Sequence, residues 1–302
     1  VALCRDEEAS GAGIVMSSES ATGFAASTGL RAYETRTEAK FSVTATVGEA
    51  TGWASGAHRS VDRLGVAERT QLALRKARAG SEPTALPPGR YTVVLEPAAV
   101  AGLLTWMLWL LDAKSYYKGT SAYAGRLGHA IVDSRLTLQN LPSHPDLLGR
   151  RFNGEGLPNR EATWIRNGVL TQLAFDRFTA RAHGVEPMAF PDAPCLSASG
   201  AVDDLISSTS RGILVTNFWY LRLVNPTDLT LTGMTRDGTF LIEGGEVRAA
   251  LKNFRFHESP LRVFSQLEAC TPPSEAVSAE TGKMLVPAMR LREFNFSSVT
   301  TF

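Results

Sequence analysis

The feature that most constrains this chain is the apolar stretch at residues 98–111, AAVAGLLTWMLWLL, which contains no charged residue. As a helix it would be apolar around its whole circumference and would have to be buried on every side. Crossing a bilayer takes about 20 apolar residues, so a stretch of 14 predicts a helix inside the protein instead. Pro97, just before it, suits a first helical turn. Trp106, Met107 and Trp109 would fill this core or, alternatively, face a partner subunit.

The sequence after this stretch is mostly typical of β-structure. Asn167-Gly168 and Gly244-Gly245 each separate two apolar runs, which predicts two-residue hairpin turns because these pairs adopt positive φ angles readily. Strands follow one another in runs and do not alternate regularly with helices. We therefore expect an α+β fold in which antiparallel sheets form a β-rich C-terminal domain around the buried apolar helix.

The N-terminal part has a different composition and indicates part of a mixed α/β domain. Its pattern predicts a helix at 66–79, with Ala67, Thr70, Leu74 and Ala77 on the buried face. The following segment, GSEPTALPPGR at 80–90, holds three prolines and two glycines and continues neither helix nor sheet. This composition divides the chain into residues 1–85 and 86–302. A short helix is also expected at 203–210.

Charge and cysteine content narrow the classes of function. The 31 basic and 30 acidic residues nearly balance, so no basic excess indicates nucleic-acid binding. Cys4, Cys195 and Cys270 are odd in number and far apart, which favours a reducing compartment over a disulfide framework. The start of the sequence shows no pattern of a signal peptide. We expect a cytoplasmic protein that binds neither nucleic acid nor a membrane.

No motif indicates a metal or nucleophile site on this chain. None of the five histidines lies in an H-E-x-x-H pattern, and zinc takes three or four protein ligands. No G-x-S-x-G precedes a helix, so a serine hydrolase is not indicated. Catalysis through Cys195 or Cys270 stays a third and weaker hypothesis.

The polar cluster Thr235–Thr239, TRDGT, has two interpretations. Asp-Gly is a common turn pair, and Arg236 could simply pair with Asp237. Alternatively, Arg236 could pair with a substrate carboxylate while the flanking strands accept an extended peptide by β-addition. The sequence leaves both interpretations open.

Several blocks, in this order along the chain, resemble the TldD/PmbA family, whose members are also called modulators of DNA gyrase. They are Tyr91–Pro97 (YTVVLEP), Lys118–Gly128 (KGTSAYAGRLG), Phe152–Pro158 (FNGEGLP), Arg211–Asn217 (RGILVTN), Gly233–Phe240 (GMTRDGTF), Lys252–Ser259 (KNFRFHES) and Val286–Leu291 (VPAMRL). Residues 1–85 then correspond to the remainder of the family's N-terminal domain, and 86–302 to its C-terminal domain.

The resemblance implies a partner chain. In this family, TldD-type and TldE-type chains form a heterodimeric protease for unfolded or leader-bearing peptides, and the TldD type carries H-E-x-x-x-H on its central helix and a later Cys. Here the helix reads LLTWMLWLL at 103–111, and the late Cys-Gly-Lys position resembles Thr281-Gly282-Lys283. This chain is therefore identified with the TldE branch, with no metal of its own and zinc on the partner subunit.

The function expected from the resemblance is that of a non-metal subunit in a peptidase complex, inactive in proteolysis when alone. The residues expected to contact substrate are Asn217, Tyr220, Arg236 and Asp237. The alternative is a catalytically silent homodimer that binds peptides or serves as a scaffold.

Overall fold

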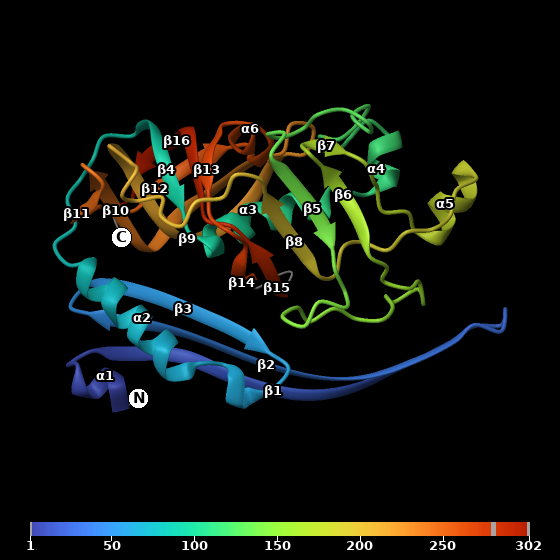
Figure 1. Ribbon diagram of the computed structural model, residues 1–302, viewed down its shortest axis with the longest axis horizontal. Coiled ribbons are helices and arrows are strands. Elements are labelled where there is room, and N and C mark those ends of the chain that lie inside the picture. Colours follow the sequence, from blue (N-terminus) through green and yellow to red (C-terminus); the bar gives the residue numbers. More distant parts are fainter. Residues whose placement is uncertain (1, 279–281, 301–302) are drawn as a thin grey trace.

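Residues 2–59 form a three-stranded antiparallel sheet with its own small core (Figure 1). The computed structural model describes residues 2–278 and 282–300 of the chain. After the short helix α1 (Ala2–Asp6), the strands follow in the order β1 (Ser10–Ala25), β2 (Arg31–Val47) and β3 (Ala50–His58). A 3-10 turn, η1 (Val61–Arg63), leads into helix α2 (Val66–Ala79), which covers one face of the sheet.

Helix α2 has the predicted bounds, but its buried face is shifted from the predicted one. Thr70, Leu74 and Ala77 are buried as expected, whereas Ala67 is exposed and Ala73 takes the fourth position. A Cβ at Gly52 of β3 would lie 2.1 Å from the carbonyl oxygen of Ala73. The close approach of strand and helix therefore depends on a residue without a side chain.

The C-terminal part is built around a closed β-barrel. Five strands pair in a ring, β10–β12–β16–β4–β9–β10, of which only the β4–β9 pairing is parallel. Their bounds are β4 (Gly89–Leu95), β9 (Arg211–Asn225), β10 (Thr230–Glu243), β12 (Phe254–Glu258) and β16 (Met289–Val299). Strand β11 (Glu246–Ala250) extends β10, and β13 (Leu267–Cys270) extends β16.

A second sheet lies beside the barrel, and helix α3 (Pro97–Trp109) packs between the two (Figure 1). Its strand order is β14 (Ser274–Ser278), β15 (Gly282–Val286), β8 (Pro194–Ala198), β5 (Leu136–Asn140), β6 (Ala162–Arg166) and β7 (Val169–Leu170). Three short helices complete the fold: α4 (Ala113–Tyr117), α5 (Arg177–His183) and α6 (Pro260–Phe264).

Helix α3 is the buried helix that the apolar stretch predicts. Leu103, Leu104 and Met107 have no more than 1% of their surface exposed, so Met107 fills the core. Trp106 is half-buried, and Trp109 at the C-terminal end is 43% exposed. The predicted α+β class, antiparallel in most pairings and arranged around this helix, is confirmed. Within the described part of the chain, no helix is long and apolar enough to cross a membrane.

Both predicted hairpin turns are confirmed, and one predicted helix is wrong. Asn167 and Gly168 have φ angles of 48° and 78°, and Gly244-Gly245 has 60° and 80°. Residues 203–210 form turns because the Asp204 side chain accepts hydrogen bonds from the backbone N–H groups of Ile206 and Ser207, at 2.8 and 3.3 Å. Such local bonds compete with the helical hydrogen bonds.

A buried polar contact joins the N-terminal sheet to the second sheet. Glu275 Oε1 accepts a hydrogen bond from Ala57 N at 2.8 Å, and Arg69 pairs with Glu275 Oε2 at 2.8 Å. Lys283 Nζ donates to Ala57 O at 2.7 Å, and burial lowers the pKa of this amine. The two cores are thus tied together, and the division at residue 85/86 stays a prediction.

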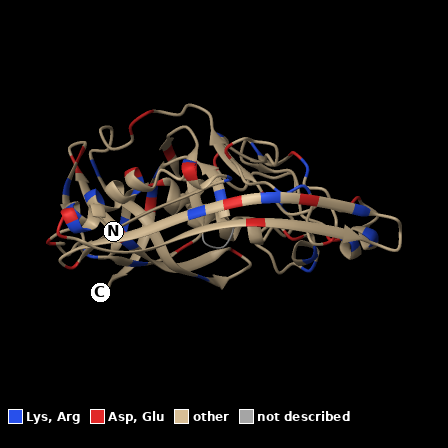
Figure 2. Ribbon diagram, turned by 90° about the horizontal axis from the view of Figure 1, so that it is seen from below, with Lys and Arg blue, Asp and Glu red and all other residues tan. Residues whose placement is uncertain are grey.

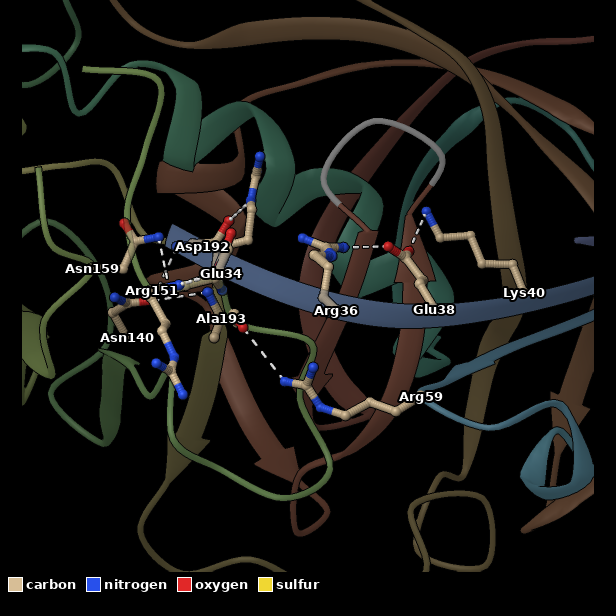
Figure 3. A network of polar contacts seen from close by, with 12 residues as sticks. Glu34, Arg36, Glu38, Lys40, Arg59, Asn140, Arg151, Asn159, Asp192 and Ala193 are labelled. Atoms are coloured by element: carbon tan, nitrogen blue, oxygen red, sulfur yellow. Dashed lines mark hydrogen bonds and ion pairs between the residues drawn. The ribbon is translucent and has the colours of Figure 1, made fainter. Parts of the chain in front are cut away.

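The hairpin of β1 and β2 extends beyond the rest of the N-terminal sheet as a long arm (Figure 1). Charges of alternating sign follow β2 (Figure 2). Because side chains two apart share a face, Glu34, Arg36, Glu38 and Lys40 point the same way. Glu34, which is buried, accepts the backbone N–H of Arg151 at 2.8 Å (Figure 3). This bond fixes the arm to the loop that precedes β6.

We expect Glu34→Ala to loosen the arm. Loss of this partly buried hydrogen bond to a carboxylate costs about 1.5–3 kcal/mol, which corresponds to roughly tenfold or faster opening. Hydrogen exchange measured by mass spectrometry should show faster exchange in peptides that cover residues 24–32 and Arg151. Glu19→Ala, on the exposed strand β1, is the matched control and should leave exchange unchanged. Equal protection in both variants would show that Glu34 does not hold the arm.

Candidate functional site

The four residues expected to contact substrate lie on the paired strands β9 and β10, but they do not form one cluster. Arg236 and Asn217 are cross-strand partners. Tyr220 is three residues further along β9 and is 54% exposed. Asp237 is only 6% exposed. The structure therefore brings Arg236 and Asn217 together, places Tyr220 further along the same surface, and separates Asp237 from them.

Two β-bulges cause this arrangement. Between Arg236 and Thr239, β10 has one residue more than its partner β9, and Asp237 takes a left-handed φ of 57°. Around Tyr220, β9 has the extra residue, and Tyr220 also has a φ of 57°. A bulge changes which face the following side chain points to. Trp219 and Tyr220 are consequently both exposed, although neighbours in a regular strand would point to opposite faces.

The exposed side of these strands carries alternating rings and guanidinium groups. Arg236 lies 4.3 Å above the Trp219 ring, and Arg222 lies 4.2 Å above the Tyr220 ring. The two rings are themselves 5.3 Å apart. We call Trp219, Tyr220, Arg222 and Arg236 the aromatic strip. Sequence reasoning missed Trp219 and Arg222, because only the bulge at Tyr220 places them on this face.

The bulge at Asp237 is held from both sides. The buried Thr216 hydroxyl donates to the carbonyl oxygens of Asp237 and Gly238, both at 3.0 Å. On the other side, Asn253 Oδ1 accepts from Thr235 and Thr239 at 3.2 and 3.1 Å. A non-glycine residue in the left-handed region costs about 1–3 kcal/mol and persists only where its surroundings fix it.

Asp237 lines a cavity of about 720 Å³ between the N-terminal sheet and the barrel. The Oδ1 atom of the Asp237 carboxylate is buried and has no hydrogen-bond partner. The Arg236 Nε atom is 3.9 Å from Oδ1, which is too far for a hydrogen bond. Burial raises the pKa of Asp237, and Thr51, Arg236 and Lys76 offset this only in part.

The turn interpretation of Thr235–Thr239 is wrong for the backbone, because these residues continue β10 through the bulge, but Arg236 does face Asp237 at 3.9 Å as that interpretation expects. Along most of its length β10 itself offers no free edge for the addition of a peptide strand. β10 pairs with β9 along most of its length and with β12 and β11 on its other side. Substrate contact by Arg236 through its side chain stays a prediction.

Helix α3 does not offer the donors that a zinc site needs. Its buried residues are Leu, Met, Ala and Val, together with Thr105. The Thr105 hydroxyl bonds to Ala101 O at 2.9 Å and to Ser278 Oγ of β14 at 3.2 Å. Among residues 2–278 and 282–300, no three His, Cys, Asp or Glu side chains lie together as metal ligands would. Thr281, at the late family position, lies outside the described residues.

The thiols of Cys195 and Cys270 do not have the surroundings of nucleophiles. Burial raises the pKa of Cys195 and of Cys270, and Cys270 is 1% exposed. A reactive cysteine needs the opposite, a pKa lowered by neighbouring positive charge and access to substrate.

Comparisons with known proteins identify the family of this chain. Residues 88–298 match the family described as the PmbA/TldA metallopeptidase C-terminal domain. The barrel and the second sheet around a central helix are thus the fold of a metallopeptidase-family C-terminal domain. The central helix α3 of this chain carries no His, Cys, Asp or Glu. The chain belongs to the TldD/PmbA family. The predicted resemblance is confirmed.

A curated relative and several solved structures are similar to this chain. A metalloprotease of Methanothermobacter thermautotrophicus is 27% identical over 141 residues, which are 42% of this chain and 31% of that protein. TldE from Thermococcus kodakarensis has a TM-score of 0.84 at 21% identity, over 97% of this chain and 71% of that one. A Thermotoga maritima protein described as a modulator of a DNA gyrase has a TM-score of 0.83 at 20% identity, over 93% and 68%.

These structural likenesses show a shared fold. The match to the metalloprotease spans about a third of that relative's length. This chain covers roughly two thirds to seven tenths of the length of each of these two solved structures.

We expect Asp237→Asn to stabilise the protein at neutral pH. The folded-state pKa of Asp237 lies above its unfolded value, so the folded state binds the proton more tightly. The stability of the wild type therefore falls as pH rises through the raised pKa. An amide does not ionise, and Asn tolerates a positive φ. Chemical denaturation should show a stability gain for Asp237→Asn that grows from pH 3 toward neutrality. A difference that does not change with pH would contradict this assignment.

Proposed function

We propose that this chain is the non-metal, TldE-like subunit of a TldD/TldE-type metallopeptidase complex. The complex would process or degrade unfolded or leader-bearing peptides in the cytoplasm. The partner subunit would supply zinc and the hydrolytic glutamate, and this chain would shape the substrate cavity and be inactive alone.

The observation that carries this proposal is the chemistry of helix α3 in a chain of a metallopeptidase family. Its buried positions hold aliphatic side chains, and its one buried hydroxyl, on Thr105, is already bonded to Ala101 and Ser278. Aliphatic side chains cannot coordinate zinc. A family member with this helix would take part in hydrolysis as the partner of a chain that carries the zinc-binding side chains.

The aromatic strip, together with Asn217, supports a role in substrate contact. Trp219 and Tyr220 are 45% and 54% exposed, although rings of this size are usually buried. Arg236 and Arg222, stacked on these rings, keep N–H donors that can bind peptide carbonyls or carboxylates. An unfolded peptide of any sequence offers carbonyl oxygens for the arginines, and its apolar side chains can pack on the rings.

The test is to purify the chain alone and together with a TldD-like chain that carries H-E-x-x-x-H, and to measure metal content and cleavage of an unfolded protein. The lone chain should be free of zinc and inert. The pair should copurify, hold about one zinc ion per heterodimer and cleave.

Other outcomes would overturn the proposal. Stoichiometric zinc on the lone chain would show that donors outside helix α3 form a site. A chain that forms only homodimers, with no cleavage in the presence of any such partner, would instead support a silent peptide-binding or scaffold protein.

We expect Arg236→Ala to raise the KM of the active pair about tenfold with little change in kcat. The reason is that a hydrogen bond from a charged group to substrate is worth about 1.5–3 kcal/mol. Arg248→Ala is the matched control, since Arg248 is an exposed arginine on the neighbouring strand β11. Zinc content should be the same in both variants. Equal KM values would remove Arg236 from the substrate site.

A further inference from the structure

The cavity that Asp237 lines combines apolar side chains with one buried acid. It lies where the β2–β3 turn, the segment after α2, the bulge of β10 and the segment between β11 and β12 meet. Its volume of about 720 Å³ is in the range of ligand sites. Val47, Ala50, Pro83 and Leu251 give it an apolar lining, and Asp237 is its buried acid.

Asp237 combines three costs in one residue. Its carboxylate is buried, its Oδ1 atom has no hydrogen-bond partner, and its backbone is in the left-handed region. Each is unfavourable for stability. Thr216 and Asn253 nevertheless hold the bulge in this form from both sides. Residues kept in this way at a cavity are typical of ligand sites.

We propose that this cavity binds a primary ammonium group on an aliphatic stem, with the Asp237 carboxylate as its acceptor. Such a ligand places its charge on the acid and its methylene groups against the apolar lining. A lysine side chain has this chemistry, and the amino terminus of a peptide has part of it. That the ammonium group belongs to a peptide rests on the proposed function. That the cavity binds an ammonium group does not.

The charges around the cavity favour a cation. Two further carboxylates, Glu49 and Glu82, line it, and Lys252 is the one cation among its described lining residues. Lys76, the nearest cation on α2, is already paired with Glu96 at 2.6 Å. Arg236, on β10, is stacked on Trp219 on the outer surface, and its Nε atom is 3.9 Å from Asp237 Oδ1, which is beyond hydrogen-bond distance. A metal ion fits less well, because no three carboxylate, His or Cys groups of the described residues lie close enough together to hold one.

The test measures binding to the whole purified chain by two-dimensional NMR titration with three probes. Nα-acetyl-lysine amide carries only the side-chain ammonium, alanine amide carries only the α-ammonium, and Nα-acetyl-norleucine amide carries the stem without a charge. The lysine probe should bind, the norleucine probe should bind at least tenfold more weakly, and the shifts should lie around Asp237 and Leu251. Stronger binding of alanine amide would make a peptide amino terminus the source.

Two variants test the role of the charge in opposite directions. Asp237→Asn, which keeps the shape and is expected to fold, should weaken the lysine probe at least about tenfold, as loss of a charged hydrogen bond does. Lys252→Gln removes the competing cation and should strengthen binding at low salt. Glu243→Gln, an exposed acid at the far end of β10, is the control and should change nothing.

The pH dependence gives an independent check. The carboxylate must be ionised to bind an ammonium, so affinity should rise with pH through the raised pKa of Asp237 and then level off. The lysine ammonium stays charged to about pH 10, whereas an α-ammonium loses its charge near pH 8. In Asp237→Asn the rise should be absent.

Binding that is the same in wild type and Asp237→Asn would overturn the inference, as would the absence of binding by every ammonium probe. Both results are obtained on the lone chain without zinc or cleavage. They therefore leave the proposed peptidase role to its own test.

Discussion

The burial of helix α3 is the constraint on which the rest of the structure depends. A helix that is apolar on every side needs a surface to pack on in all directions, and no single sheet provides one. The barrel covers one side and the six-stranded sheet the other, and residues of both join α3 in one continuous core. The N-terminal sheet is not needed for this core, and it builds a separate small one under α2. The N-terminal and C-terminal parts therefore have separate cores, and the contacts of Glu275 and Lys283 join them.

Closing five strands into a barrel has a consequence for the surface. A small closed barrel needs sharp local bends, and bulges supply them at Tyr220, Asp237 and Glu293, each with a φ of 57°. The bulge at Tyr220 exposes two rings in succession, and the one at Asp237 places an acid in a cavity. The candidate site is thus a product of barrel geometry. The same strands also form the core that holds these bulges in place.

Local patterns in the sequence were enough for the parts of the fold that depend on local chemistry. The limits of α2, the apolar helix and both two-residue hairpins follow from periodicity, proline position and glycine-containing pairs. The family followed from ordered blocks. The expected helix at 203–210 failed for a local reason, the hydrogen bonds of the Asp204 side chain, whereas the failures at the candidate site occurred where distant partners decide. Asp237-Gly238 has the local signature of a turn, but pairing with β9 and the hydroxyl of Thr216 keep it within a strand. No local signal marks Trp219 as exposed.

The two faces of β10 at the bulge explain why neighbouring residues have different chemistry. Arg236 is exposed and stacks on an indole, and a guanidinium in water is tolerated there at little cost. Asp237 is turned into a cavity, where its charge is disfavoured and one oxygen lacks a donor. Proteins usually keep such a residue where stability is traded for binding. An ammonium group bound to the Asp237 carboxylate would supply a donor and the opposite charge together, so a ligand of that kind would offset the cost of this buried acid.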